Sequence, residues 1–117
     1  SRSGHELIID SEGAVGPTPM ELLLLGTGGC ACFDVVMILE KARQDIVDVR
    51  VEVGGERRDE MPRYFTDIEM HFVVEGTGVK ASHVVRAIDL AMTKYCSASA
   101  QLAALAEIKT SFEIIEV

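Results

Sequence analysis

The sequence has little positive charge, with 11 Lys and Arg residues against 19 Asp and Glu residues and a formal net charge of −8. No cluster of Lys and Arg forms a basic stripe along the chain. Nucleic acids and anionic membranes bind through such clusters, because their phosphates have to be neutralised. We therefore expect no nucleic acid and no membrane surface among the partners.

Long hydrophobic runs and paired cysteines are also lacking. The uncharged stretch 22–33 is closed by Glu21 and Asp34, whereas a membrane span needs about 20 mainly apolar residues. The acidic, Gly- and Pro-containing segment before it does not resemble a signal peptide. Three cysteines are an odd number, which a fully paired secreted scaffold would not have. We expect a buried core helix and reduced thiols in a cytoplasmic protein.

Sequence motifs for metal, phosphate and hydrolytic sites are missing as well. Neither CxxC nor HExxH occurs, and Cys30 and Cys32 would point about 200° apart on a helix, so they cannot readily share a zinc ion. The glycines at 26–29 lack the Lys-Ser/Thr of a phosphate loop, and Ser97 and Ser99 lack the Gly-x-Ser-x-Gly of a hydrolase. We expect neither a metal nor an organic cofactor.

The chain has 117 residues, of which 48% are hydrophobic, and it shows neither repeats nor linkers. Residues 1–117 therefore form a single domain of the α+β class. Helical periodicity predicts helices over 19–44 and 81–94 and a short Ala-rich helix up to about 106. Alternating patterns predict strands over 46–53, 68–74 and 108–117, and a short apolar run predicts another over 4–10. The strands 46–53 and 68–74 could pair antiparallel.

The first helix has the most distinctive sequence. Thr18-Pro19-Met20-Glu21 matches a capping box with proline at the first helical position. The first half of the helix is apolar nearly all round, which predicts that it is enclosed on every side. Glycines at 26, 28 and 29 each disfavour a helix by about 1 kcal/mol relative to Ala. We expect another backbone to approach closely there in a tight helix crossing, and a dimer is plausible.

Two cysteines lie in contexts that suggest thiol chemistry. A free cysteine is often a small buried hydrophobe, and Cys32 fits that description. Cys30 follows the glycines, and Cys96 lies where a new helix begins, with Ser97 or Ser99 as the cap. Backbone amides at a helix start favour a thiolate and would lower the pKa of Cys96. From these contexts alone, a reactive pair and two packing residues are both possible.

Two segments together resemble the OsmC/Ohr family of thiol-dependent peroxidases, the osmotically inducible and organic hydroperoxide resistance proteins. They are PTPMELLLLGTGGC, which ends at Cys30, and KYCSAS, which contains Cys96. The resemblance covers nearly the whole chain and is closest to the YhfA-like branch. It implies an OsmC-like intertwined homodimer, with mixed sheets from both chains around a long buried central helix and active sites at the subunit interface. This chain departs from the family in its N-terminal strands, which we expect to be absent or abbreviated.

The resemblance also implies residue roles. Cys30 would be the peroxidatic thiolate that reduces an organic hydroperoxide, and Cys96 the resolving thiol that forms a disulfide with it, recycled by an external dithiol. The family's Glu, which pairs with an Arg, lies ten residues before the peroxidatic Cys. That position is Met20 here, so Glu21, one residue later, is the candidate for the catalytic Glu. Arg63 is the candidate for the family's activating Arg. The alternative is a non-catalytic member that binds a small apolar or thiol-reactive ligand at the dimer interface.

Overall fold

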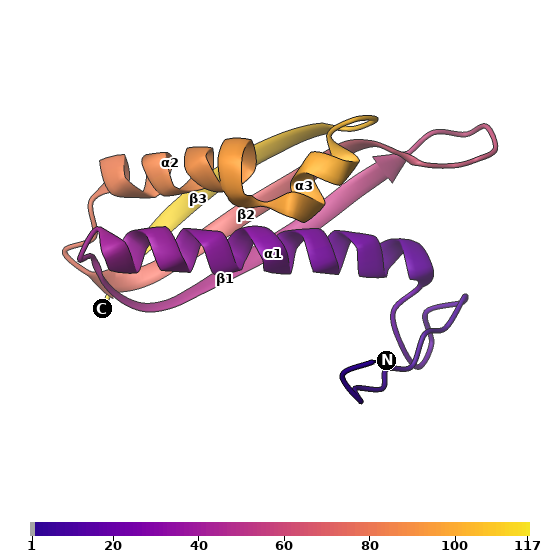
Figure 1. Cartoon of the computed structure of the whole chain (residues 1–117), viewed down its shortest axis with the longest axis horizontal. Helices are drawn as coiled ribbons and strands as arrows, with labels where there is room; N and C mark the ends of the chain where they lie inside the picture. Colours follow the sequence, from indigo (N-terminus) through magenta and orange to yellow (C-terminus); the bar gives the residue numbers. More distant parts are fainter. Residues whose placement is uncertain (1) are drawn as a thin grey trace.

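A computed structural model describes residues 2–117, and Figure 1 shows a curved sheet with helices on one face. In chain order the elements are α1 (Pro19–Lys41), β1 (Asp45–Arg57), β2 (Phe65–Thr77), α2 (Ala81–Leu90), η1 (Ala91–Tyr95), α3 (Ser97–Leu102) and β3 (Glu107–Glu116). The η1 segment is a π-helical turn that continues α2. The predicted α+β class is confirmed.

The sheet is mixed, with strand order β1-β2-β3. β1 and β2 pair antiparallel, as their alternating patterns suggested, and β2 pairs parallel with β3. Parallel neighbours need a crossover connection, which α2, η1 and α3 supply. The crossover carries the chain back over the face of the sheet where α1 lies (Figure 1), so the start of α3 comes to lie beside the middle of α1.

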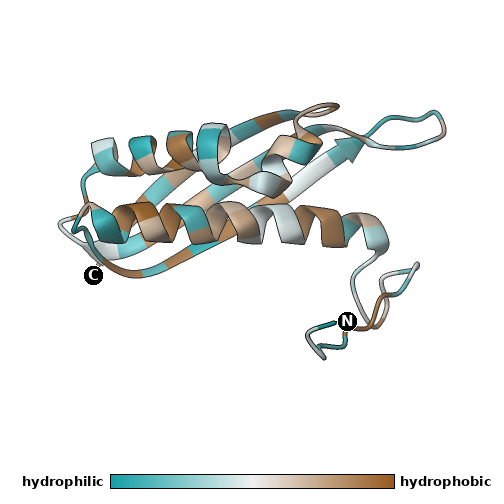
Figure 2. Cartoon of the chain, viewed as in Figure 1, coloured by the Kyte–Doolittle hydropathy of each residue, from teal (hydrophilic) through white to brown (hydrophobic). Residues whose placement is uncertain are grey.

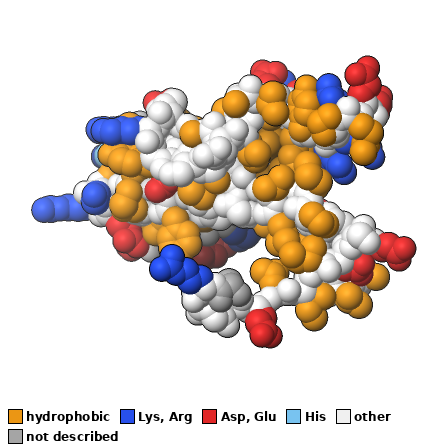
Figure 3. Space-filling view, turned by 45° about the vertical axis from the view of Figure 1, so that its right-hand side comes forward, with side chains coloured by type: hydrophobic (Ala, Val, Ile, Leu, Met, Phe, Trp, Pro, Cys, Tyr) orange, Lys and Arg blue, Asp and Glu red, His pale blue; other side chains and the backbone are white. Residues whose placement is uncertain are grey.

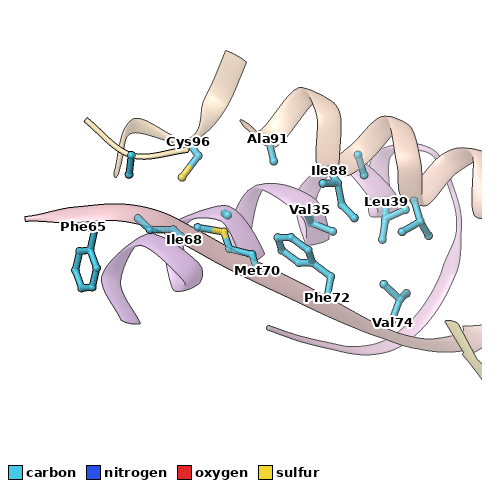
Figure 4. Close-up of a cluster of buried hydrophobic side chains, with 14 residues drawn as sticks. Val35, Leu39, Phe65, Ile68, Met70, Phe72, Val74, Ile88, Ala91 and Cys96 are labelled. Carbon is cyan, nitrogen blue, oxygen red and sulfur yellow. The ribbon is translucent and has the colours of Figure 1, made fainter. Parts of the chain in front are cut away.

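The hydrophobic core lies between the central strand and the helices (Figure 4). β2 contributes alternate side chains, as its period-two pattern predicts. They are Ile68, Met70, Phe72 and Val74, each 0 or 1% exposed. From α1, Ala31, Val35 and Leu39 are fully buried and lie one turn apart on one side of the helix. The predicted strands and helices therefore meet through the faces that their patterns indicated.

The predicted strand over 4–10 does not form, and this prediction was wrong. Residues 5–10 carry no strand pairing within residues 2–117, and Leu7, Ile8 and Ile9 are more than half exposed. The Asp10 carboxylate instead accepts backbone N–H bonds from residues 12, 14 and 15, and these bonds lower the pKa of Asp10. An apolar run becomes a strand only where a neighbouring strand is available, and this segment has none among the residues that the structure describes.

A register shift in β1 also changes the predicted alternation. The pairing slips between Ile46 and Asp48, so that Val47 is 66% exposed, although strict alternation would place it on the same face as Val49, Val51 and Val53. One extra residue in a strand moves the side chains before it to the opposite face of the sheet. Val49, Val51 and Val53 lie after the shift and pack against the core as predicted.

Within one chain, α1 is covered on one side only, so the predicted enclosure on every side is wrong for the monomer. Leu25 is 58% and Phe33 81% exposed, and Figure 2 shows how apolar the helix is along much of its length. By length and composition alone, α1 could cross a membrane, a test that the core helix of a soluble protein also passes. The helix has a free apolar face.

The glycines of α1 divide between its two sides. A Cβ at Gly28 would overlap the Cγ2 of Val53, so this glycine lets α1 approach β1 closely, a strand rather than the predicted helix. At Gly26 and Gly29 a Cβ would meet nothing within 4 Å in this chain. These two positions lie on the free face. The helix then ends at Lys41, because Arg43 adopts a positive φ of 59°.

Candidate functional site

The structure brings Cys30 and Cys96 together and adds a third side chain, Asp34. The two Sγ atoms and one carboxylate oxygen all lie within 4.8 Å of one another. Cys30 and Asp34 are four residues apart on α1, which places them on the same side of the helix one turn apart. Cys96 comes from the start of α3. We refer to Cys30, Asp34 and Cys96 as the thiol–carboxylate cluster.

Cys96 is held in place by the first turn of α3. It is itself the N-cap of that helix, where Ser97 or Ser99 was expected. The Ser99 backbone N–H and Oγ both donate to Cys96 Sγ, at 3.4 and 3.0 Å. Sγ also lies 3.9 Å from the carbonyl oxygen of Thr27 on α1. Cys96 is 3% exposed and lies at one end of the hydrophobic core (Figure 4).

The pKa of Cys96 moves in the direction opposite to the prediction. Burial raises it, the two hydrogen bonds from Ser99 act in the lowering direction, and neighbouring Cys30 adds to the rise. The helix-start effect that we invoked is present in the Ser99 N–H bond, but removal of the thiolate from water outweighs it. Cys96 is therefore held as a neutral thiol.

Cys32 lies apart from the cluster. Its Sγ donates to the carbonyl oxygen of Val49 on β1, at 3.5 Å, so it faces the sheet. Burial and the nearby carboxylate of Asp48 raise the pKa of Cys32. The expectation that Cys30 and Cys32 point in different directions agrees with this arrangement.

The structure places Glu21 at the start of α1, away from the cluster in its own chain. Its Oε1 accepts from the backbone N–H of Thr18 at 3.0 Å, and its own N–H donates to Thr18 Oγ1 at 3.2 Å, so the predicted capping box is confirmed. Nine residues of helix rise separate it from Cys30, about 13 Å along the axis. Arg63 is exposed in the β1–β2 connection, where its Nε donates to the carbonyl oxygen of Arg58.

Asp34 is the cluster residue that the sequence reasoning missed. Across residues 2–117, its Oδ2 is a buried side-chain oxygen with no hydrogen-bond partner. Such an atom loses its water without a replacement, at a cost of about 1–3 kcal/mol. The i, i+4 spacing from Cys30 was a signal that could have suggested the pair, but only the tertiary structure adds Cys96.

A cavity of about 340 Å³ lies between the C-terminal half of α1 and α2. Its apolar lining includes Met37 and Ile38, and its basic lining residues are Lys41, His83 and Arg86. Tyr95, which precedes Cys96 in the chain, also lines it. The cavity therefore combines an apolar lining with positive charge in a chain that is acidic overall.

Comparisons with known proteins agree on one family. The family model described as "OsmC-like protein" matches residues 10–111. Protein YhfA of Escherichia coli K12 is 46% identical over 116 residues, covering 98% of this chain and 87% of YhfA. A hypothetical protein from Aquifex aeolicus has a solved structure that is 31% identical, with a TM-score of 0.83 over 96% of this chain and 95% of its own.

A more distant solved structure carries a functional name. The organic hydroperoxide resistance protein OsmC from Legionella pneumophila is 15% identical, with a TM-score of 0.69 over 86% of this chain and 72% of its own. At that identity the likeness concerns the fold. The same arrangement of strands and helices is thus found in a protein named for hydroperoxide resistance.

Proposed function

This chain belongs to the OsmC-like protein family, as its sequence predicted, and on that premise we propose that it reduces organic hydroperoxides through Cys30 and Cys96. The observation that carries the proposal is the proximity of the two sulfurs, which lie within 4.8 Å of each other. Both are free thiols, and a disulfide can form only between cysteines whose sulfurs approach each other in this way. The family includes a protein named for hydroperoxide resistance, which supports a redox role.

The reaction has three steps. The Cys30 thiolate attacks the terminal oxygen of the hydroperoxide, the O–O bond breaks, and the leaving alkoxide takes a proton to become an alcohol. The resulting Cys30 sulfenic acid condenses with the Cys96 thiol, which forms the disulfide and releases water. An external dithiol then exchanges with this disulfide, becoming oxidised and restoring both thiols.

The environments of the two cysteines support this order. Cys30 is partly exposed, whereas Cys96 is 3% exposed, so a substrate reaches Cys30 more readily. The raised pKa of Cys96 keeps it protonated, and the proton on Cys96 leaves with the sulfenic oxygen as water. Cys30 therefore acts as the peroxidatic and Cys96 as the resolving residue.

We place the working site in a homodimer. The free face of α1 exposes Leu25 and Phe33, with Gly26 and Gly29 between them, and Figure 3 shows apolar side chains exposed at several places on the surface of the molecule. Small residues let a second helix approach closely, and the exposed side chains would be buried against it. The partner chain would cover the apolar surroundings of Cys30, which suits an organic hydroperoxide. The reduced thiols are consistent with a cytoplasmic location.

A turnover assay tests the proposal. Reduced protein is mixed with cumene hydroperoxide and dihydrolipoamide, and peroxide consumption is followed for wild type, Cys30→Ser and Cys96→Ser. We expect Cys30→Ser to abolish turnover. With the dithiol left out, Cys96→Ser should consume about one equivalent of peroxide per chain and accumulate a sulfenic acid that a cyclic diketone traps. Cys32→Ser is the matched control and should turn over like wild type, since its sulfur faces β1.

Two results would contradict the proposal. Turnover that neither Cys30→Ser nor Cys96→Ser changes would remove the thiols from the reaction. A complete lack of turnover by folded, reduced wild type with any dithiol or hydroperoxide would favour the second interpretation, a non-catalytic member that binds a small apolar or thiol-reactive ligand at the dimer interface.

A further inference from the structure

We propose that Cys30, Asp34 and Cys96 also form a binding site for a thiophilic divalent cation such as Zn²⁺. In a tetrahedral zinc site, Zn–S is about 2.3 Å and Zn–O about 2.0–2.2 Å, so the ligand atoms lie about 3.5–3.8 Å apart. The three ligand atoms of the cluster lie within 4.8 Å of one another. The ligand atoms would have to close by about 1 Å around the bound ion.

The source of the ligands follows a pattern common in metal sites. Two ligands one helical turn apart come from α1, and the third comes from a separate element, the start of α3. Cys32 cannot readily share an ion with Cys30, because the two side chains point away from each other on α1. Asp34 can do so, because it lies one turn further along on the same side of α1 as Cys30.

The unpartnered oxygen of Asp34 is the independent observation that points to a cation. Oδ2 is buried and receives no hydrogen bond from any residue in 2–117. Carboxylate oxygen and cysteine sulfur are both ligands that zinc takes in proteins, so the unpartnered oxygen lies beside two further donors of the right kind. A bound divalent cation gives the carboxylate its missing partner and stabilises both thiolates.

Ser99 already supports Cys96 as a ligand. Its N–H and Oγ donate to Cys96 Sγ at 3.4 and 3.0 Å, and hydrogen bonds of this kind orient a metal ligand and stabilise its charge. Three protein ligands leave a fourth tetrahedral position for water or another small molecule, as in zinc sites that are open to solvent. Cys30 and Asp34 are both partly exposed, which gives the ion a route in.

Binding is written as an exchange of protons for the cation. The two thiols release two protons to solvent as their sulfurs coordinate the ion, Asp34 coordinates as the carboxylate, and no electron is transferred. The occupied site carries a net charge of −1, from two thiolates, one carboxylate and the dication. While the ion is bound, neither sulfur is free to attack a peroxide, so cation binding and disulfide formation exclude each other.

Cobalt titration of the reduced full chain, without air, peroxide or dithiol, tests the site. A phosphine reductant keeps the thiols reduced and is removed before Co²⁺ is added. We expect one Co²⁺ per chain, visible bands of tetrahedral cobalt and a near-ultraviolet sulfur-to-cobalt band, with Zn²⁺ displacing the cobalt. Cys30→Ser should lose the sulfur band in part. Asp34→Asn should weaken binding at least about tenfold, because even the loss of a residue that only supports a ligand costs about 10–100-fold in metal affinity.

Cys32→Ser is the matched control and should bind Co²⁺ like wild type, because its sulfur lies outside the cluster. Oxidation of Cys30 and Cys96 to a disulfide should abolish binding. The proposal is overturned if Asp34→Asn and Cys30→Ser bind as tightly as wild type while circular dichroism shows them folded. It is also overturned if Asp34→Asn changes only dimer dissociation, since Oδ2 would then pair with a partner chain. Neither result depends on peroxidase turnover, so the two proposals fail separately.

Discussion

Burial governs the chemistry of single residues in this protein more than local sequence does. Cys96 lies at a helix start, which favours a thiolate, yet its burial raises the pKa. The pKa of Cys32 is also raised, mainly by burial and to a smaller extent by the nearby carboxylate of Asp48. Both thiols therefore hold their protons more tightly in the folded chain than in the unfolded chain.

This difference predicts that stability declines in alkali. Because the folded state binds more protons than the unfolded state as pH rises above about 8.5, the free energy of unfolding falls over that range and through the folded pKa of each thiol. The contribution is fully present below about pH 8.5. Urea unfolding of reduced protein at a series of pH values should show a shallower alkaline fall for Cys96→Ala and Cys32→Ala than for wild type. Equal slopes would show that neither thiol has a raised pKa.

At the scale of elements, capping and glycine placement explain how α1 supports the site. The capping box fixes where the helix begins, and counting turns from that start places Cys30 and Asp34 on one side. Gly28 lets the helix lie close to β1, where a Cβ would overlap Val53. Position along the helix and its distance from the sheet together determine where the Cys30 sulfur lies.

Glu21 gives a test that separates a structural from a catalytic role. Glutamine can replace glutamate in a capping box, so Glu21→Gln should leave the urea midpoint nearly unchanged, whereas Glu21→Ala should lower the free energy of unfolding by about 1 kcal/mol. If the cap is its whole role, hydroperoxide turnover by Glu21→Gln equals that of wild type. A large fall in kcat/KM at unchanged stability would assign Glu21 the catalytic role that the family resemblance suggested.

At the scale of the whole molecule, a single chain leaves many apolar side chains exposed to solvent. α1 is buried against the sheet on one side and bears exposed Leu25 and Phe33 on the other. The N-terminal segment adds Leu7, Ile8 and Ile9, all more than half exposed. Exposed apolar side chains grouped in this way are typical of surfaces that are covered in an assembly, and a second copy of the chain presents the same face.

Phe33 tests the proposed dimer. It is 81% exposed in the single chain, so Phe33→Glu should not disturb the monomer fold, yet it would place a charge in an interface built on α1. Sedimentation should show wild type as a dimer and Phe33→Glu as a folded monomer. Val85→Glu on α2, also at an exposed apolar position, is the matched control and should remain a dimer. A wild type that sediments as a stable monomer would contradict the proposed assembly.

The sequence by itself determined the helices, the three long strands and the start of α1, because each depends on periodicity or on a cap that four consecutive residues specify. Its two family segments also identified the cysteines that the structure brings together. Tertiary structure decided which segments pair as strands and which face of the sheet a side chain occupies. The apolar run before residue 10 found no strand to pair with, and Val47 turned outward at a register shift.

Tertiary structure also decided the surroundings of the two thiols. The raised pKa of Cys96 and the presence of Asp34 beside the sulfurs depend on the crossover that brings α3 back onto α1. Burial and proximity are properties of segments far apart in the chain, so no reading of neighbouring residues supplies them. The sequence determined which residues could react, and the packing of α3 against α1 decided what environment they share.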